Sequence, residues 1–541
     1  MRTAAVELAQ QAQQDQQVVA LLLKVYDERT KTIPKSMVLV ILVVKIMKKY
    51  IFNNYYILRH DAKRSYILSQ GDYITPPAHV AVNLNWSSMI HPVYAMMLSF
   101  FCKPITIDEA CTNISSFLSI NKDIVVDFIN RLLETDQAMH TDFANHENGF
   151  PVNLIIEEEK ETFPRVMYTP DEFAFTELDF DSPRRYVAPL SIVFMPNNNC
   201  YTKCIYCYAD TTPKPRHLSL DCISKFIKEA KDMGVRDFLI TGGDLFMYRH
   251  WKELLDILEE TGFLPDLIST KKPLSDEEVT LFAKFGIRLQ LSLDSMDEET
   301  AMKVLHVKPG YIEQMKASIQ KIEETGIRYQ IATVLTSMND SLINLDEMYG
   351  YLSQLKNLKR WEIRIAFKSL YSKSNFDEIK SKRANITAVS KWIDEHKSQF
   401  PCEILWSPDD DAKYHKTKGG SQYFEGNLCS ANISNMVILP DGQVTVCEQL
   451  YWNKNFIIGN VNESSLKDIW TSERAINLWK RKQESINANS PCSLCKIFDK
   501  CFTTSNRCYA DIMKAYGTEN FDFPDPRCYW APKFINNVTH E

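Results

Sequence analysis

Three cysteines within eight residues are the feature that most constrains this chain. Cys200, Cys204 and Cys207 form a C-x3-C-x2-C loop, and Tyr206 stands directly before the last cysteine. The loop follows residues 191–195, a short apolar run typical of a buried strand. Three thiolates on one loop can bind a metal centre and leave one coordination position open, where a substrate or cofactor can bind.

Two simpler interpretations compete with an iron-sulfur site. Zinc sites favour C-x2-C pairs with a second pair or histidines at a suitable spacing. No second pair follows locally, and His217 is the nearest histidine downstream. The thiols could also fill a core. The preceding strand and Tyr206 favour an iron-sulfur centre.

Composition indicates a large globular protein. The 541 residues predict three or four domains, and 45% hydrophobic with 24% charged residues is ordinary usage. A net charge of -7 lacks the basic footprint of nucleic-acid binding. Fourteen cysteines, many in local clusters, favour metals over a secreted disulfide framework, and so a reducing cytoplasm. The apolar run 37–47 is shorter than the roughly 20 residues of a membrane-spanning helix, so we expect no membrane.

The N-terminal part divides into an extension and a small module. We expect residues 1–46 to be an extension that is not native or is disordered, with a natural start near Met47. Residues 47–142 predict strands at 56–58, 66–68 and 80–84, then three helices, at 92–101, 110–118 and from Asn121 or Lys122. Thr106 and Glu109 form a capping box before the second helix. This order is typical of a winged-helix-like module. Its third helix has one basic residue, Arg131, which argues against DNA binding.

The middle of the chain alternates strands and helices. Residues 143–187, broken by prolines, predict a connector. Residues 188–400 predict parallel strands joined by helices, and hence an open or closed α/β barrel whose chemistry lies at the carboxyl ends of the strands. The expected strands are 191–195, 237–240, 267–269, 287–293, 329–335 and 361–366, with helices at 220–233, 276–285 and 311–325 among them.

The cysteine loop resembles the cluster motif of the radical S-adenosylmethionine (SAM) superfamily. The resemblance implies a partial (β/α)6 barrel, a 4Fe-4S cluster held by Cys200, Cys204 and Cys207, and SAM bound at its open iron. In that family a Gly-Gly-Glu-Pro segment binds the methionyl amino group of SAM. Here Gly242, Gly243 and Asp244 follow the second strand, with aspartate in place of glutamate. The other implied cofactor contacts are Tyr206, Ser292 at the ribose, Asp294 as a loop-orienting group or a helix cap, and Thr333 and Arg364 at the adenine side and carboxylate.

Residues 401–541 contain a second cysteine-rich region, which resembles the SPASM auxiliary-cluster domain. A Pro-Asp-Gly turn at 440–442 predicts a hairpin between strands at 436–439 and 443–446. Carrying the family pattern over, one cluster would be held by Cys492, Cys495, Cys501 and Cys528, and the other by Cys429, Cys447 and Cys508.

The sequence departs from the family pattern at one position, and it leaves the roles of the remaining cysteines open. Six residues separate Cys501 from Cys508, where the family usually has three, which leaves the ligation of Cys508 unsettled. Cys402 is interpreted either as a distant ligand of the second cluster or, in the preferred interpretation, as a buried structural thiol. Cys102, Cys111 and Cys222 lie on helical patterns and predict core packing.

The N-terminal module resembles the leader-binding domain of enzymes that mature ribosomally made peptides, which adds a precursor leader as a strand to a sheet edge. The resemblance therefore implies a radical SAM, SPASM-containing peptide maturase that cleaves SAM to a 5'-deoxyadenosyl radical, abstracts a hydrogen and forms a thioether or carbon-carbon crosslink. The same resemblance implies three 4Fe-4S clusters as cofactors. It also implies two partners, a precursor peptide and a flavodoxin or ferredoxin that donates electrons. The alternatives are an anaerobic sulfatase-maturing enzyme and a non-catalytic iron-sulfur electron carrier that binds peptides.

Overall fold

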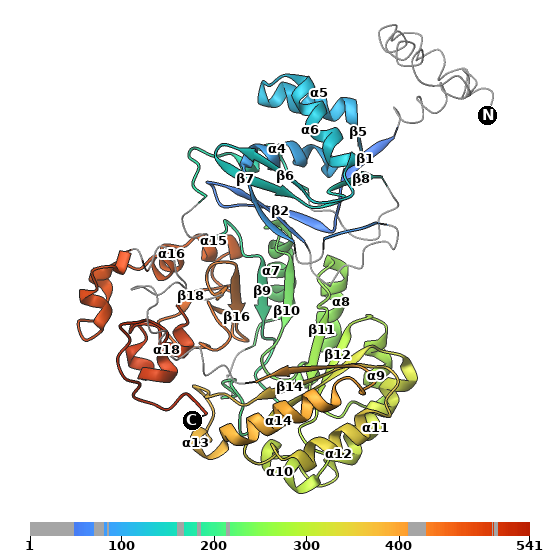
Figure 1. Cartoon of the computed structure of the whole chain (residues 1–541), viewed down its shortest axis with the longest axis vertical. Helices are drawn as coiled ribbons and strands as arrows, with labels where there is room; N and C mark the ends of the chain where they lie inside the picture. Colours follow the sequence, from blue (N-terminus) through green and yellow to red (C-terminus); the bar gives the residue numbers. More distant parts are fainter. Residues whose placement is uncertain are drawn as a thin grey trace, which may run out of the picture.

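The computed structural model describes residues 48–69, 80–83, 86–158, 167–180, 185–212, 217–408, 429–499, 501 and 507–540. The expected extension 1–46 lies outside these residues. Three regions follow one another along the chain: an N-terminal module of small sheets and helices, a central α/β barrel, and a C-terminal cysteine-rich region beside the first barrel strand (Figure 1). No helix of the described regions combines the length and apolar character needed to cross a bilayer.

The N-terminal module has two three-stranded sheets and a hairpin. One sheet has the order β5-β1-β8, the other β2-β3-β4, and β6 pairs with β7. The predicted capping box is present, because Thr106 accepts a hydrogen bond from the Glu109 amide and the Glu109 side chain accepts one from Thr106. The elements are β1 Lys49–Phe52, β2 Tyr56–His60, β3 Ser65–Ser69, β4 Ser87–Ile90, α4 Pro92–Ser99, β5 Ile105–Thr106, α5 Ile107–Leu118, α6 Lys122–Glu134, β6 Met139–Phe143, β7 His146–Phe150 and β8 Ile155–Glu157.

Two expectations for this module need correction. The third strand of the sheet is β4, not residues 80–84, of which 80–83 lie outside any strand. The reason is that the Asn83 amide donates to the Tyr56 hydroxyl, 2.8 Å away, and its side chain accepts from the Val152 amide, so this segment is held by loop contacts. The sheets also continue into the expected connector 143–187, because β8 pairs with β1 and β7 with β6.

The central region is a partial barrel of parallel strands with helices outside. The predicted bounds of β10, β13 and α11 match the structure. A seventh parallel strand, β15, pairs with β14 and was not expected from the sequence. The elements are β9 Ser191–Phe194, α7 Leu220–Asp232, β10 Asp237–Ile240, α8 Trp251–Thr261, β11 Leu267–Thr270, α9 Asp276–Ala283, β12 Arg288–Ser292, α10 Glu298–Leu305, α11 Tyr311–Thr325, β13 Tyr329–Leu335, α12 Leu342–Leu352, β14 Leu358–Ile365, α13 Phe376–Ile379, α14 Arg383–His396 and β15 Glu403–Ser407.

The C-terminal region completes the first half of the barrel. The expected hairpin is present: β16 Asn435–Ile438 and β17 Gln443–Thr445 pair around a turn in which Gly442 has φ +89°, a conformation that favours glycine. β16 also pairs in parallel with β9, so one of the two sheets of the barrel region has the order β10-β9-β16-β17-β18, and the other has the order β11-β12-β13-β14-β15. The remaining elements are β18 Ile457–Asn460, α15 Leu466–Thr471, α16 Glu473–Trp479 and α18 Tyr509–Tyr516, with short 3-10 turns at Phe100–Cys102, Pro170–Phe173, Leu245–Met247, Gln483–Ser485, Pro491–Leu494 and Thr518–Asn520.

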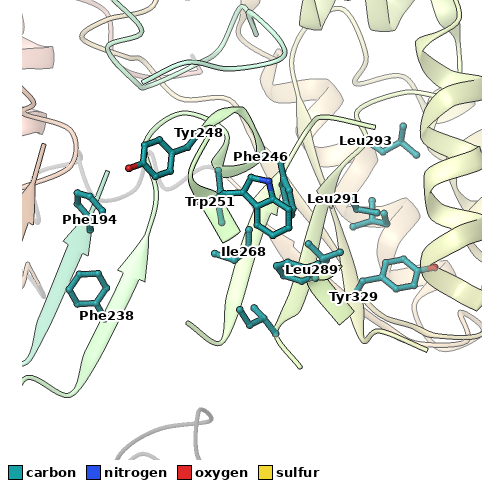
Figure 2. Packing of buried hydrophobic residues seen from close by; sticks show 14 of the residues in the cluster. Phe194, Phe238, Phe246, Tyr248, Trp251, Ile268, Leu289, Leu291, Leu293 and Tyr329 are labelled. Carbon is teal, nitrogen blue, oxygen red and sulfur yellow. The ribbon is translucent and has the colours of Figure 1, made fainter. Parts of the chain in front are cut away.

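A large apolar cluster joins the barrel strands to the surrounding helices. Phe194 and Phe238 lie side by side on β9 and β10, and Trp251 at the start of α8 packs edge-on against Phe246, with ring centroids 5.1 Å apart (Figure 2). Leu289 and Leu291 of β12 are fully buried in the same cluster. This packing fixes the strands, and with them the loops at their carboxyl ends.

Candidate active site and metal centres

The cysteine loop begins where β9 ends and is fastened to the barrel on two sides. The amides of Lys203 and Ile205 donate to the carbonyls of Leu305 and Val304 at the end of α10, at 2.9 and 3.0 Å. The Ser372 hydroxyl donates to the Ile205 carbonyl at 2.6 Å. These hydrogen bonds hold the loop against the end of α10 and the segment after β14.

The three thiols of this loop are half-buried and lie near one another. Burial, with smaller contributions from the charges of Asp244, Cys207 and Cys204, raises the pKa of Cys200 to about 12. Burial also raises the pKa of Cys204 and of Cys207. Thiolates this costly to form in an apolar site need positive charge beside them, from a metal centre or from the protein.

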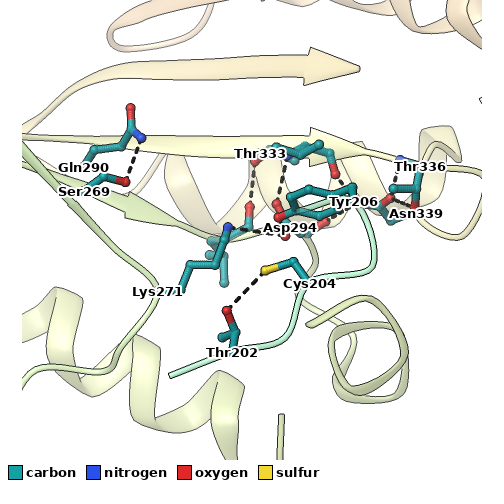
Figure 3. Close-up of polar contacts among 12 residues, drawn as sticks. Thr202, Cys204, Tyr206, Ser269, Lys271, Gln290, Asp294, Thr333, Thr336 and Asn339 are labelled. Carbon is teal, nitrogen blue, oxygen red and sulfur yellow. Dashed lines mark hydrogen bonds and ion pairs between the residues drawn. The ribbon is translucent and has the colours of Figure 1, made fainter. Parts of the chain in front are cut away.

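The protein supplies such a charge from Lys271, directly after β11. Burial alone lowers the pKa of Lys271, but Asp294 and all three thiols raise it, and the net direction is upward. The Lys271 ammonium lies 3.8 Å from an Asp294 carboxylate oxygen and 5.5 Å from the Tyr206 ring centroid. Figure 3 shows this cation facing Cys204, Tyr206 and Asp294.

Asp294 orients the loop and does not cap a helix. Its fully buried carboxylate accepts from the Tyr206 hydroxyl at 2.5 Å and from the Val334 amide at 2.8 Å (Figure 3). The helix-cap interpretation of Asp294 is wrong, because Asp297 caps α10 by accepting from the Thr300 amide. Asp294 thus connects the aromatic residue of the cysteine loop to the ends of β12 and β13.

The glycine turn after β10 packs tightly against the segment before Cys200. The Gly243 amide donates to the Asn197 carbonyl and the Asp244 amide to the Asn199 carbonyl. A Cβ on Gly243 would lie 2.1 Å from the Asn199 carbonyl oxygen, and Gly242 has φ +106°. Both positions therefore require glycine for this close approach.

The Asp244 carboxylate accepts hydrogen bonds from other groups of the protein. It accepts from the Thr270 hydroxyl at 2.6 Å, from the Lys271 amide at 3.1 Å and from the Phe246 amide at 3.1 Å. These contacts join the end of β10 to the end of β11 and position the residue that carries the buried cation. Asp244 therefore holds Lys271 in place, a role that the sequence did not reveal.

The three remaining residues that were expected to contact SAM, Ser292, Thr333 and Arg364, lie in different surroundings. Ser292 is buried at the last position of β12. Thr333 faces the helix layer, contrary to expectation, because its hydroxyl donates to the Leu293 carbonyl at 2.7 Å and accepts from the Trp361 indole at 2.9 Å. Arg364 pairs with Glu362 at 2.6 Å. Burial raises the pKa of Tyr208, which follows the cysteine loop, and the charge of Arg364 opposes this rise, so Arg364 lies on the side of the thiols.

Three C-terminal thiols, those of Cys429, Cys447 and Cys508, form a second group. Burial raises the pKa of all three, to about 12 for Cys447, and the charge of Cys429 raises the pKa of the other two. Carboxylates surround them: the Cys508 amide donates to Asp525 at 2.9 Å, and Asp511 raises the pKa of Cys508. The three thiols therefore converge in spite of the long gap before Cys508.

Four more cysteines form a third group: Cys492, Cys495, Cys501 and Cys528. Gln483 donates to the carbonyls of Cys492 and Cys495, at 3.0 and 2.9 Å, and so fixes the turn that bears both. Burial raises the pKa of Cys528 to about 11, with further contributions from Cys492 and Cys501. Arg507 donates hydrogen bonds to the thiols of Cys492 and Cys501.

The other cysteines lie away from these groups. Cys402 borders Glu403 and Lys359 at the amino ends of the barrel strands, so it is not a ligand of the second group. Cys102 and Cys111 are buried in the core of the N-terminal module, and Cys222 is half-buried against Asn462. All fourteen cysteines are free thiols. Within the described parts of the chain, no three His, Cys, Asp or Glu side chains are close enough to hold a single metal ion.

Comparisons with known proteins agree with these groups. The radical SAM superfamily model matches residues 194–348, and that of SPASM, an iron-sulfur cluster-binding domain, matches residues 429–496. The chain is 25% identical to the sporulation killing factor maturation protein SkfB of Bacillus subtilis (strain 168), covering 54% of this chain and 67% of that protein. It is 21% identical to the antilisterial bacteriocin subtilosin biosynthesis protein AlbA of the same organism, covering 63% and 71%.

A solved structure shares the fold over most of the chain. SuiB of Streptococcus suis, bound to the precursor peptide SuiA, superposes with a TM-score of 0.60 at 17% identity, covering 89% of this chain and 100% of that one. The same protein solved with S-adenosylmethionine gives 0.59 at 16% identity, covering 88% and 100%. With three thiols at the end of the first barrel strand and two further thiol groups in the C-terminal region, the chain is an enzyme that contains a radical SAM domain followed by a SPASM iron-sulfur cluster-binding domain, and the cofactors of these two domains are SAM and 4Fe-4S clusters.

Proposed function

We propose that this enzyme modifies a ribosomally made precursor peptide by removing two hydrogens and forming a thioether or carbon-carbon crosslink. The observation that carries the proposal is the presence of three separate thiol groups in one chain, one at the barrel mouth and two in the adjoining SPASM domain. Its relatives SkfB and AlbA are described as maturation and biosynthesis proteins of peptide products, and SuiB was solved with a precursor peptide.

The residues at the barrel mouth would divide the work of binding SAM. Cys200, Cys204 and Cys207 would hold three irons of one cluster and leave the fourth for SAM. The bound cluster and SAM supply the 5'-deoxyadenosyl radical that abstracts a hydrogen atom. Lys271 keeps a positive charge against the thiolates, and Asp294 fixes Tyr206 and with it the loop.

Other side chains would orient SAM around this centre. Gly242 and Gly243 bring backbone groups close to the cysteine loop, where the methionyl amino group would bind. Ser292 would contact the ribose and Arg364 the carboxylate, since both lie at the strand ends that surround the loop. Because the Thr333 hydroxyl is used by Leu293 and Trp361, its side chain has no part in this proposal.

The two C-terminal thiol groups would hold the auxiliary clusters, with Cys429, Cys447 and Cys508 in one and Cys492, Cys495, Cys501 and Cys528 in the other. Crosslinking removes two hydrogens from the peptide. One would leave as a hydrogen atom to the 5'-deoxyadenosyl radical and the other as a proton, and an auxiliary cluster held by these thiols would accept the remaining electron. A flavodoxin or ferredoxin would supply the electron that starts SAM cleavage. The fourteen free thiols suit the reducing cytoplasm.

We place the peptide leader on the N-terminal module, by strand addition. The outer edge of β4 is already covered, because Ser88 donates to the Gly149 carbonyl and the His146 ring contacts the Met89 carbonyl. Among the described strands, β6 pairs with β7 alone, so its outer edge offers backbone groups to an added strand. The leader should therefore slow amide hydrogen exchange in β6, whereas protection confined to β4 would contradict this placement.

Anaerobic incubation of the reconstituted enzyme with SAM and dithionite tests the catalytic proposal. We expect 5'-deoxyadenosine, and none from the variant with Cys200, Cys204 and Cys207 changed to alanine. Absence of 5'-deoxyadenosine from an enzyme with full iron content would favour the electron-carrier alternative. A peptide encoded beside the gene, synthesised in full and treated with enzyme, should lose two hydrogens by mass spectrometry. Formylglycine in its place would identify a sulfatase-maturing activity.

A further inference from the structure

A buried guanidinium contacts two thiols of the third cysteine group. Arg507 is 9% exposed. Its two terminal nitrogens donate to the Cys492 sulfur at 3.4 Å and to the Cys501 sulfur at 3.2 Å. Arg507 therefore brings a positive charge and two hydrogen bonds directly to sulfur atoms that would bind a cluster.

The electrostatic surroundings of the second group have the opposite character. The Asp525 carboxylate accepts from the Cys508 amide at 2.9 Å, so negative charge lies close to this group of thiols. Two cations lie beside this group, and both are paired with carboxylates: Arg527 lies 2.6 Å from Asp525 and 3.6 Å from Asp511, and Lys514 lies 3.8 Å from Asp511. The carboxylates therefore offset much of the positive charge near the thiols.

These surroundings predict different reduction potentials for the two auxiliary clusters. Adding an electron makes a cluster more negative, so positive charge and hydrogen bonds to sulfur favour the reduced form, and carboxylates oppose it. We propose that Arg507 raises the reduction potential of the cluster held by the third group above that of the cluster held by the second group. An electron that reaches either auxiliary cluster is then held preferentially by the cluster of the third group. This inference depends on the ligand groups and not on the identity of the peptide.

Arg507→Met tests the proposal in a protein without the SAM-binding cluster. The background changes Cys200, Cys204 and Cys207 to alanine, so that the auxiliary clusters alone are titrated. Dithionite titration under argon, followed by electron paramagnetic resonance, gives one midpoint for each cluster. The midpoint that disappears when Cys492 and Cys495 are changed to alanine belongs to the third group.

We expect Arg507→Met to lower that midpoint alone, by at least a tenfold change in the equilibrium constant for one-electron reduction, or about 59 mV. Arg507→Lys, which keeps the charge on a single donor, should give a smaller decrease. Arg481→Met is the matched control: Arg481 is also largely buried, but it faces Asp522 and the Phe521 ring, so its loss should leave both midpoints unchanged.

Three outcomes would overturn the proposal. An unchanged midpoint in Arg507→Met with full iron content is the first. If Arg507→Met does not bind the cluster, the midpoint of Arg507→Lys is measured in its place. A midpoint equal to that of the wild type in Arg507→Lys is the second outcome. The third is loss of the cluster from both variants, which would show that Arg507 serves cluster binding and not its potential.

Discussion

Lys271 offers the sharpest test of the barrel site, because its ammonium faces Asp294 in a nearly dry environment. The Asp294 side chain is fully buried and that of Lys271 is 19% exposed, with 3.8 Å between the charged atoms. Replacing Lys271 by methionine keeps the volume and removes the charge. Asp294 then keeps its hydrogen bonds from Tyr206 and Val334 but loses its nearest cation.

The size of the effect follows from this distance. Two unit charges 3.8 Å apart attract by about 4 kcal/mol at an effective dielectric constant of about 20. Desolvation of both groups offsets part of this attraction. We therefore expect a coupling energy of about 2 kcal/mol between Lys271 and Asp294, which is about a 30-fold effect on an equilibrium constant.

A double-mutant cycle measures this coupling. Urea unfolding of the cluster-free protein gives the free energy of unfolding for the wild type, Lys271→Met, Asp294→Asn and the double variant. Lys272→Met is the matched control, since the adjacent Lys272 pairs with Glu278 at 2.5 Å. The same variants, reconstituted and given SAM and dithionite, report the rate of 5'-deoxyadenosine formation, which Lys271→Met should lower far more than Lys272→Met does.

A coupling energy below about 0.5 kcal/mol would show that Lys271 and Asp294 act independently and would refute the reasoning. Equal 5'-deoxyadenosine rates in the two lysine variants would refute the link from this pair to the thiol loop. Loss of stability without coupling would assign Lys271 to packing, because its aliphatic stem also covers apolar surface.

Three further predictions follow from the same structure. Gly243→Ala should displace the cysteine loop, because its Cβ would lie 2.1 Å from the Asn199 carbonyl, and iron analysis should show loss of about four of about twelve irons per chain. Changing Cys492 and Cys495 to alanine should also remove about four irons, but should leave uncoupled SAM cleavage in place. The melting temperature should fall between pH 7.5 and pH 5.5, and fall less in His60→Gln. Burial lowers the pKa of His60 from 6.5, so the unfolded chain binds the proton first as the pH falls, and stability decreases.

Each of these predictions has a control. Gly350→Ala should leave the iron content unchanged, since a Cβ there meets nothing within 4 Å. Full iron content in Gly243→Ala would contradict the close-approach argument. Loss of SAM cleavage with the Cys492 and Cys495 variant would mean that the two sites depend on each other. An equal pH dependence in wild type and His60→Gln would show that other groups carry the effect.

Local patterns in the sequence were enough to locate many elements. The bounds of β10, β13 and α11 could be predicted because a short apolar run between turns indicates a buried strand, and a 3.6-residue repeat indicates a helix. The capping box at Thr106 and the Pro-Asp-Gly turn before Gln443 act over a few residues. For the same reason, the spacing of Cys200, Cys204 and Cys207 alone indicated one metal-binding group, whereas the two C-terminal groups were implied by the resemblance to the SPASM domain.

Local sequence patterns could not predict the direction of a side chain or the pairing of strands that are distant in the sequence. Thr333 stands on a strand where successive residues alternate between the barrel interior and the helices, and only the observed bond to Trp361 shows which side it takes. The pairing of β16 with β9 joins residues more than two hundred positions apart. Lys271 belongs to no motif, and its one signal was its place two residues after the predicted strand 267–269.

The sequence by itself determined the class of chemistry, because the number and spacing of cysteines on one loop set how many irons a protein can hold and whether one stays open. It also determined the order of the barrel elements, since these depend on local periodicity. The tertiary structure alone decided which charges face the thiols: Lys271 at the barrel mouth, carboxylates around Cys508 and Arg507 beside Cys492. Electrostatic energies depend on distance and burial, and folding sets both by bringing distant segments together.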